Sequence, residues 1–219
     1  MTNTPLFIVF EGTDGSGTTT QGNLLTQQLQ QAGHSVHRTA QPSPGPIGQL
    51  IRAALRGQLE GRLDARTVAL LFAADRVDHG HREIQPALDR GDVVVCDRYL
   101  GSSLAFQVVD GSGGISEDWL LEINSGALVP DVSIWVDVPP EVAVARIVAR
   151  GQPQERFEVL DTLRQVRQRY RDVFARAPKG LGRCVVVDGQ PAPPEVAASI
   201  YAIAMECLSN SATKNRSAN

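Results

Sequence analysis

The sequence predicts an α/β protein with a doubly wound parallel sheet of about five strands and helices on both faces. Two observations carry this prediction. Short runs of apolar, often β-branched residues alternate along the 219-residue chain with longer stretches of helical pattern. The runs are nearly continuous rather than alternating with polar residues, which is typical of strands buried on both faces of a parallel sheet.

The strong strands are expected at residues 6–10, 93–96, 132–136 and 184–187, and a weaker one at 35–39. The helices are expected at residues 19–31, 47–56, 64–90, 117–126, 140–150, 155–175 and 194–208. Strands that alternate with helices imply right-handed crossover connections. Ligands of such sheets bind beyond the carboxyl ends of the strands, so the residues that follow each strand are the candidates for function.

Length and composition indicate one ordinary globular domain. Residues 1–208 are expected to form it, and residues 209–219 to be a disordered tail, because that stretch has no apolar face to bury. A net charge of −3 disfavours a nucleic-acid polymer as the main partner. The three cysteines form no metal-binding spacing, and no signal peptide or membrane-length apolar stretch is present. We therefore expect a cytoplasmic protein with no membrane association.

A glycine-rich loop follows the first expected strand and precedes the first helix. Gly12, Gly15 and Gly17 let the backbone curl so that its amides and the helix N-terminus face one anion, as in a P-loop. The stretch fits G-x-x-x-x-G-K-[ST] except that Thr18 stands in place of lysine, and Thr19 stands where a hydroxyl usually reaches Mg²⁺. The alternative, a turn without a ligand, is disfavoured by the strand–loop–helix order. The candidates for binding a polyphosphate cofactor in this loop are Gly12, Thr13, Asp14, Gly15, Ser16, Gly17, Thr18, Thr19 and Thr20.

Two charged residues follow the strand expected at residues 93–96. Asp97 at the end of a buried strand suits Mg²⁺ near the phosphates, so Thr19 and Asp97 are the candidate metal ligands. Arg98 beside it can hold a second phosphate with its forked head. The alternative is a surface ion pair, which the position at the same sheet edge as the loop disfavours.

The helix expected at residues 64–90 carries a possible base-binding pair. Phe72 and Arg76 lie four residues apart and therefore share one helix face. An aromatic plate and a forked donor together suit a planar base. Taken singly, Phe72 reads as a core residue and Arg76 as a solvated charge. His79 on the same helix is predicted to be structural.

These segments resemble the thymidylate kinase family over nearly the whole chain. The family loop FEGxDGxGKTTQ corresponds to residues 10–21, and LLFAADRxxH to residues 70–79. The signature D-R-Y-x-x-S-S-x-A-[YF]-Q corresponds to residues 97–107. The family stretches P-D-x-x-x-x-x-D-V and V-R-x-x-Y correspond to residues 130–138 and 166–170. The second and third of these motifs are far more specific than the loop.

The resemblance implies an ATP-dependent nucleoside monophosphate kinase that converts dTMP to dTDP for dTTP synthesis, with Mg²⁺ and usually as a homodimer. By family position, the substrate-binding residues are Asp14, Phe72, Arg76, Arg98, Ser102, Ser103, Phe106 and Gln107. The expected catalytic residues are Asp97, Arg98, Arg150 and Arg156, and Arg146 joins the loop in binding ATP. A lid over ATP is expected at about residues 146–158.

The sequence departs from the family pattern at Thr18. Loss of the lysine charge at the β- and γ-phosphates would cost about 2–4 kcal/mol if nothing replaced it. The chain has only two lysines, Lys179 and Lys214, and neither lies near the loop in sequence. Our hypothesis from the sequence is that Arg150 or Arg156 in the lid supplies the charge.

A second departure lies at Ala40 and Gln41, where the family has the arginine and glutamate of T-R-E-P. Arg38 and Arg52 are nearby, and the sequence does not decide whether either compensates. Two alternatives stay open: a catalytically weak nucleotide-binding sensor on the same fold, and a kinase for another nucleoside monophosphate. A GTPase is disfavoured because no N-K-x-D motif occurs.

Overall fold

The structure is a computed structural model that describes residues 4–109, 114–149 and 159–217, with the backbone alone considered for 212–217. Its strands are β1 Leu6–Glu11, β2 Val36–Ala40, β3 Val93–Asp97, β4 Val132–Asp137 and β5 Arg183–Asp188. Its α-helices are α1 Thr18–Gln31, α2 Pro46–Leu55, α3 Ala65–His79, α4 Gln85–Asp89, α5 Leu100–Ser102, α6 Glu117–Ile123, α7 Pro140–Ala149, α8 Leu160–Arg176 and α9 Pro193–Ser217. Two π-helical turns, η1 Gly80–Ile84 and η2 Ser103–Gln107, and a 3₁₀ turn, η3 Lys179–Leu181, complete the described elements.

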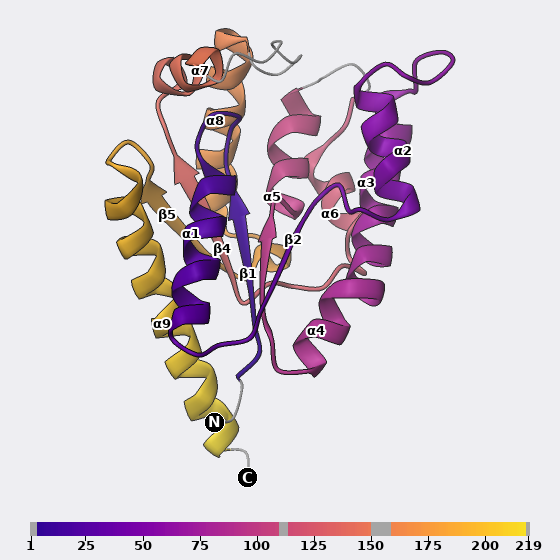
Figure 1. The fold of residues 1–219 in the computed structure, drawn as a ribbon. Coiled ribbons are helices and arrows are strands. Elements are labelled where there is room, and N and C mark those ends of the chain that lie inside the picture. Colours follow the sequence, from indigo (N-terminus) through magenta and orange to yellow (C-terminus); the bar gives the residue numbers. More distant parts are fainter. Residues whose placement is uncertain (1–3, 110–113, 150–158, 218–219) are drawn as a thin grey trace.

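The five described strands form one parallel sheet in the order β2-β3-β1-β4-β5. The predicted doubly wound α/β fold is therefore confirmed. The register pairs Asp97 with Phe10 on β1 and with Ala40 on β2. Three strand ends thus meet at one edge, toward which the strand arrowheads point in Figure 1.

Helices cover both faces of the sheet, because each face is apolar. One buried cluster joins β1, β3 and β4 to α1, α7 and α9. The second joins the opposite face to α3, α4 and α8 and to η2. Figure 1 shows α1 and α9 side by side on one side and the α3–α4 rod on the other, which leaves the loops at the upper edge for function.

The helix expected at residues 64–90 is present as α3, η1 and α4 in sequence, with a widened turn between the two α-helices. Pro86 explains the widening: it has no N–H for the carbonyl four residues earlier, and its ring would collide with that carbonyl in a regular α-helix. The helix 100–107 after β3 was not predicted from the sequence. It packs against α8, so tertiary contact rather than local pattern accounts for it.

The last helix is longer than expected: α9 continues to Ser217, into the stretch 209–219 for which the sequence predicts disorder. Extending an existing helix costs much less than starting one, so polar residues can follow a packed helix without a buried face. Arg150 and Arg156, and with them most of the expected lid, lie outside the described residues.

Candidate functional site

The glycine-rich loop lies between the end of β1 and the start of α1. Gly15 and Gly17 have φ values of +78° and +94°, which side-chain-bearing residues rarely adopt. A Cβ at Gly12 would lie too close to the Ser16 hydroxyl oxygen, so a side chain at this position would force Ser16 to shift. The amide of Ser16 donates to Thr13 O at 3.1 Å. The loop therefore has the compact shape that turns backbone amides toward an anion.

Thr18 is the first residue of α1 and is buried. Its methyl group is near the loop, since a Cβ at Gly12 would lie 3.1 Å from Thr18 Cγ2. It supplies no charge. Lys179 belongs to η3, which packs near α5 rather than on the loop. No lysine side chain in the described residues takes the missing role.

The two candidate metal ligands lie together. Thr19 Oγ1 donates to Asp97 Oδ2 at 2.5 Å, across 78 residues of sequence. Asp97 Oδ1 is buried and has no hydrogen-bond partner among the described residues. The described residues contain no cluster of three or more His, Cys, Asp or Glu that could hold a metal by itself. The pair therefore fits Mg²⁺, which usually binds one or two protein oxygens together with substrate phosphates.

Arg98 takes a left-handed backbone, with φ of +67°. Its amide donates to Phe10 O at 2.8 Å, and its guanidinium donates to Gly12 O at 3.0 Å and Asp14 Oδ1 at 2.5 Å. The guanidinium also lies 5.0 Å from the centroid of the Phe106 ring. Burial acts to lower the pKa of Arg98, but Asp14 and other nearby acids raise it above its ordinary value. A permanent cation is thus held at the carboxyl end of β3, beside the loop.

Glu11, at the end of β1, is a buried acid that lies within the family loop pattern at residues 10–21 but was not among the predicted site residues. It accepts hydrogen bonds from Tyr99 N at 3.1 Å, Ser102 Oγ at 2.6 Å and Tyr170 OH at 3.3 Å. Burial raises the pKa of its carboxyl group, against the hydrogen bond from Ser102 and the charge of Arg98. Glu11 therefore fixes the backbone beside Arg98. Its signal in the sequence was an acid at the end of an entirely apolar run.

Arg76 is 1% exposed, so the reading of this residue as a solvated charge was wrong. Its guanidinium donates to Gln41 Oε1 at 3.1 Å, Tyr99 O at 3.1 Å, Ser103 Oγ at 2.9 Å and Asn124 Oδ1. Burial lowers the pKa of Arg76, and the acids around it raise it only in part. Neutral acceptors, Ser103 among them, therefore hold a buried cation at this point.

The remaining substrate-pocket candidates lie around this network. Phe72 is half-buried one helical turn before Arg76. Ser102 and Phe106 line the Arg98 side through the contacts above, and Gln107 Oε1 is buried with no hydrogen-bond partner among the described residues. An unpartnered buried carbonyl oxygen in a candidate pocket is a natural acceptor for a ligand donor.

The structure accounts for Gln41 and Arg52. Gln41 bridges Arg76 and His79, with its Nε2 3.3 Å from His79 Nδ1. His79 also lies 2.8 Å from Thr39 Oγ1 and is buried, which agrees with a structural role. Arg52 donates to the carbonyls of Pro42 and Ser43, so it holds the backbone of that loop.

Arg146 projects from α7 toward the phosphate loop. It donates to Ser16 O at 3.4 Å and to Gly189 O at 2.9 Å. The loop thus gains a cation from α7, at a residue that lies 130 positions after Ser16 in the chain. Thr20, also a candidate, is exposed in the first turn of α1.

No described helix combines the length and the apolar character needed to span a membrane. The thymidylate kinase family model matches residues 10–200 of the chain. A thymidylate kinase from Thermomicrobium roseum is 42% identical over 209 residues, covering 92% of this chain and 95% of its own. A thymidylate kinase from Solidesulfovibrio magneticus is 36% identical over 215 residues, covering 93% of this chain and 100% of its own.

Proposed function

Because the chain belongs to the thymidylate kinase family, we propose that it transfers the γ-phosphoryl group of ATP to dTMP, giving dTDP for dTTP synthesis. The observation that carries this proposal is the position of Arg98. Its guanidinium stands beside the phosphate loop, next to an aromatic ring and opposite Asp14. A donor phosphate on the loop and an acceptor phosphate on Arg98 would then face each other.

Arg98 binds the dTMP phosphate, and Asp14 lies near the sugar 3′-hydroxyl. The ion pair between them, 2.5 Å long, keeps both side chains at the junction of the two nucleotide sites. The dTMP phosphate is ionised at neutral pH and attacks directly, so no strong general base is needed. What the site supplies is alignment and positive charge.

Mg²⁺ is proposed at Thr19 and Asp97, on the grounds of their mutual contact and the unpartnered Asp97 oxygen. When bound, it would neutralise charge on the β- and γ-phosphates of ATP. The protein's own contribution is to hold the hydroxyl and the carboxylate at the end of β3 and the start of α1. The loop amides and Arg146 bind the rest of the triphosphate.

The base is proposed to stack on Phe72 and to meet the Arg76 network. Since Gln41, Ser103, Asn124 and Tyr99 O already fix the guanidinium through four of its five N–H groups, the one remaining N–H, on Nη1, points in a set direction. A preorganised donor of this kind suits a pyrimidine carbonyl oxygen. Gln107 adds an acceptor for a base or sugar donor.

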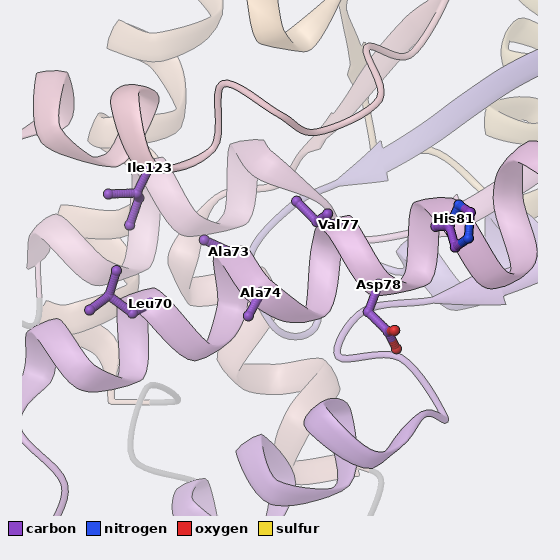
Figure 2. Close-up of a pocket in the computed structure, with 7 residues that line it drawn as sticks. All are labelled: Leu70, Ala73, Ala74, Val77, Asp78, His81 and Ile123. Carbon is purple, nitrogen blue, oxygen red and sulfur yellow. The ribbon is translucent and has the colours of Figure 1, made fainter.

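A homodimer in the cytoplasm is also proposed. A mainly apolar groove of about 580 Å³ runs along α3, with Ile123 of α6 on one side and the polar Asp78 and His81 toward one end. Figure 2 shows Leu70, Ala73, Ala74 and Val77 along one side of α3 with Ile123 across from Leu70. Leu70 and Val77 are 50% and 47% exposed, so this groove presents two large apolar side chains to solvent in a lone subunit. The cysteines Cys96, Cys184 and Cys207 are free, which suits a reducing compartment.

The test is ADP formation by the purified protein with ATP and Mg²⁺, compared across dTMP, dUMP, UMP and dCMP. We expect the highest kcat/KM for dTMP, and for Arg98→Met a loss of about a hundredfold or more, as for removal of a charged transition-state contact. Arg171→Met, at an exposed position on α8, is the matched control. ATP binding by calorimetry without dTMP-dependent ADP formation would contradict the proposal and favour a sensor.

A further inference from the structure

We propose that Arg38 of β2 provides the positive charge that the phosphate loop lacks at Thr18, and that it acts as a positioning residue through Asp97. This inference rests on the kinase function proposed above. It concerns how the donor phosphates are neutralised in a loop without lysine. The grounds are the placement of Arg38, its contacts, and a space left for it in α1.

Arg38 occupies a position where the fold otherwise places apolar residues. Val36, two residues earlier on the same face of β2, packs into the cluster beneath α1, and Val95 on the neighbouring strand belongs to that cluster. The methylene groups of an arginine at such a position must pack along the apolar surface, so that its guanidinium reaches a polar site. The polar site within reach is the carboxyl end of β3.

The contacts of Arg38 fix its guanidinium there. Nη1 donates to Thr39 O at 2.7 Å and to Val95 O at 3.2 Å, and Nη2 lies 3.5 Å from Asp97 Oδ2. The side chain is 22% exposed, and its Nε is buried without a hydrogen-bond partner among the described residues. A half-buried cation with one buried, unsatisfied N–H is costly, so its presence beside Asp97 calls for a compensating interaction.

Helix α1 contains a glycine where it passes this guanidinium. A Cβ on Gly22 would lie 2.6 Å from Arg38 Nη2 and 2.8 Å from its Cζ. Glycine is among the poorest helix formers, and Gly22 is in the helix interior with no turn or cap to form. The chain thus keeps an unfavourable residue at the point that gives Arg38 its room, one helical turn after Thr18.

A continuous set of contacts joins Arg38 to the phosphate loop. Arg38 meets Asp97, and Asp97 Oδ2 accepts from Thr19, the neighbour of Thr18 in the first turn of α1. Of the other cations near the loop, Arg98 pairs with Asp14, and Arg146 donates to Ser16 O of the loop and to Gly189 O, so neither makes a hydrogen bond or ion pair with Asp97 among the described residues. Arg38 is therefore the described arginine that orients Asp97 and offsets its charge; with Mg²⁺ bound, this would leave more of the metal's charge for the phosphates.

The experiment is a double-mutant cycle between Arg38→Met and Thr18→Lys, with kcat and the KM for dTMP as readouts. We expect Arg38→Met to lower kcat by about tenfold or more while the KM for dTMP changes by less than about threefold. Thr18→Lys in the Arg38→Met background should restore most of this loss, but change kcat of the otherwise wild-type protein by less than about threefold. A lysine on α1 cannot repair a merely structural defect in β2.

Arg38→Gln separates charge from hydrogen bonding, because the amide can still donate to a carbonyl. We expect it to lose activity as Arg38→Met does and to be rescued by the same lysine, whereas Arg38→Lys keeps more activity than either. Arg183→Met is the matched control. It removes an exposed arginine of the edge strand β5 that pairs with Glu206 of α9. Thermal unfolding of each variant identifies any that fail to fold, and Arg38→Gln then carries the test.

Two results would overturn the inference while leaving the proposed function intact. One is an active wild type in which neither Arg38→Met nor Arg38→Gln lowers kcat by more than about threefold. The other is an effect of Thr18→Lys that is the same with and without Arg38. An inactive wild type would instead contradict the proposed function itself.

Discussion

At the scale of single residues, the site depends on two neighbours in space, Arg98 and Glu11, that are far apart in sequence. Arg98 has a left-handed backbone, a conformation that costs free energy in a residue with a side chain. Glu11 offsets that cost by holding Tyr99 N and Ser102 Oγ on the following turn. A buried acid thus positions a cation without pairing with it directly.

Burial of Glu11 predicts a pH dependence of stability. Its carboxyl pKa is raised in the folded state above its ordinary value of 4.5, so the folded state holds the proton more tightly than the unfolded state does. The stability that this contributes is complete below pH 4.5 and is lost as pH rises through the raised pKa. Glutamine does not titrate, so only the wild type loses this stability. We therefore expect the free energy of unfolding of Glu11→Gln minus that of wild type to increase as pH rises through that window. The increase should be about 1.4 kcal/mol for each tenfold difference in proton affinity between the folded and unfolded states.

Urea unfolding between about pH 4 and pH 8 measures this difference. Glu195→Gln, at an exposed position early in α9, is the control and should follow the wild type at every pH. Parallel pH profiles for Glu11→Gln and wild type would show that Glu11 titrates alike in the folded and unfolded states.

At the scale of elements, α1 combines a regular helix with an exception at Gly22. An alanine there removes the penalty of a helical glycine, worth about 0.5–1 kcal/mol, but places a methyl group against Arg38. We expect Gly22→Ala to destabilise the wild type and to lower kcat. In the Arg38→Met background the same change should stabilise the protein, because methionine has no guanidinium and leaves space for the alanine methyl group.

Chemical denaturation and turnover in both backgrounds check this reversal of sign. Asn23→Ala, the next and exposed position of α1, should have the same effect with and without Arg38. Stabilisation by Gly22→Ala in the wild type would mean that the guanidinium moves aside without consequence.

Local sequence predicted the strands of this protein but not its π-helical turns. The strands were found within a residue or so of their bounds because continuous apolar runs report burial on both faces. The π-helical turns at Gly80–Ile84 and Ser103–Gln107 carry no periodic signal. The first follows from Pro86, and the second depends on packing against α8, which no local pattern encodes.

At the scale of the whole molecule, the apolar groove on α3 predicts association. If a second copy covers it, charges at Leu70 and Val77 should separate the subunits, because buried carboxylates without partners cost several kcal/mol. We expect the double variant Leu70→Glu with Val77→Glu to sediment as a monomer where the wild type sediments as a dimer. Both should keep their secondary structure by circular dichroism.

Val148→Glu, at a 71% exposed position on α7 away from the groove, is the control for added charge and should remain dimeric. A wild-type protein that sediments as a monomer at all concentrations would contradict the proposed dimer. So would a double variant that stays dimeric.

The sequence by itself determined the fold class, the loop without lysine and the family, because these reside in continuous motifs and in burial patterns that neighbouring residues share. It placed Asp97 and Thr19 at one site, since strand ends of a parallel sheet meet at one edge. Only the tertiary structure decided what surrounds them. The contacts of Arg38 with Asp97, of Glu11 with Tyr170 and of Gln41 with Arg76 join segments 35 to 159 residues apart. Such contacts depend on how far a side chain extends and on the space that other elements leave for it, as Gly22 of α1 does for Arg38 of β2. Neither can be predicted from a single segment of the sequence.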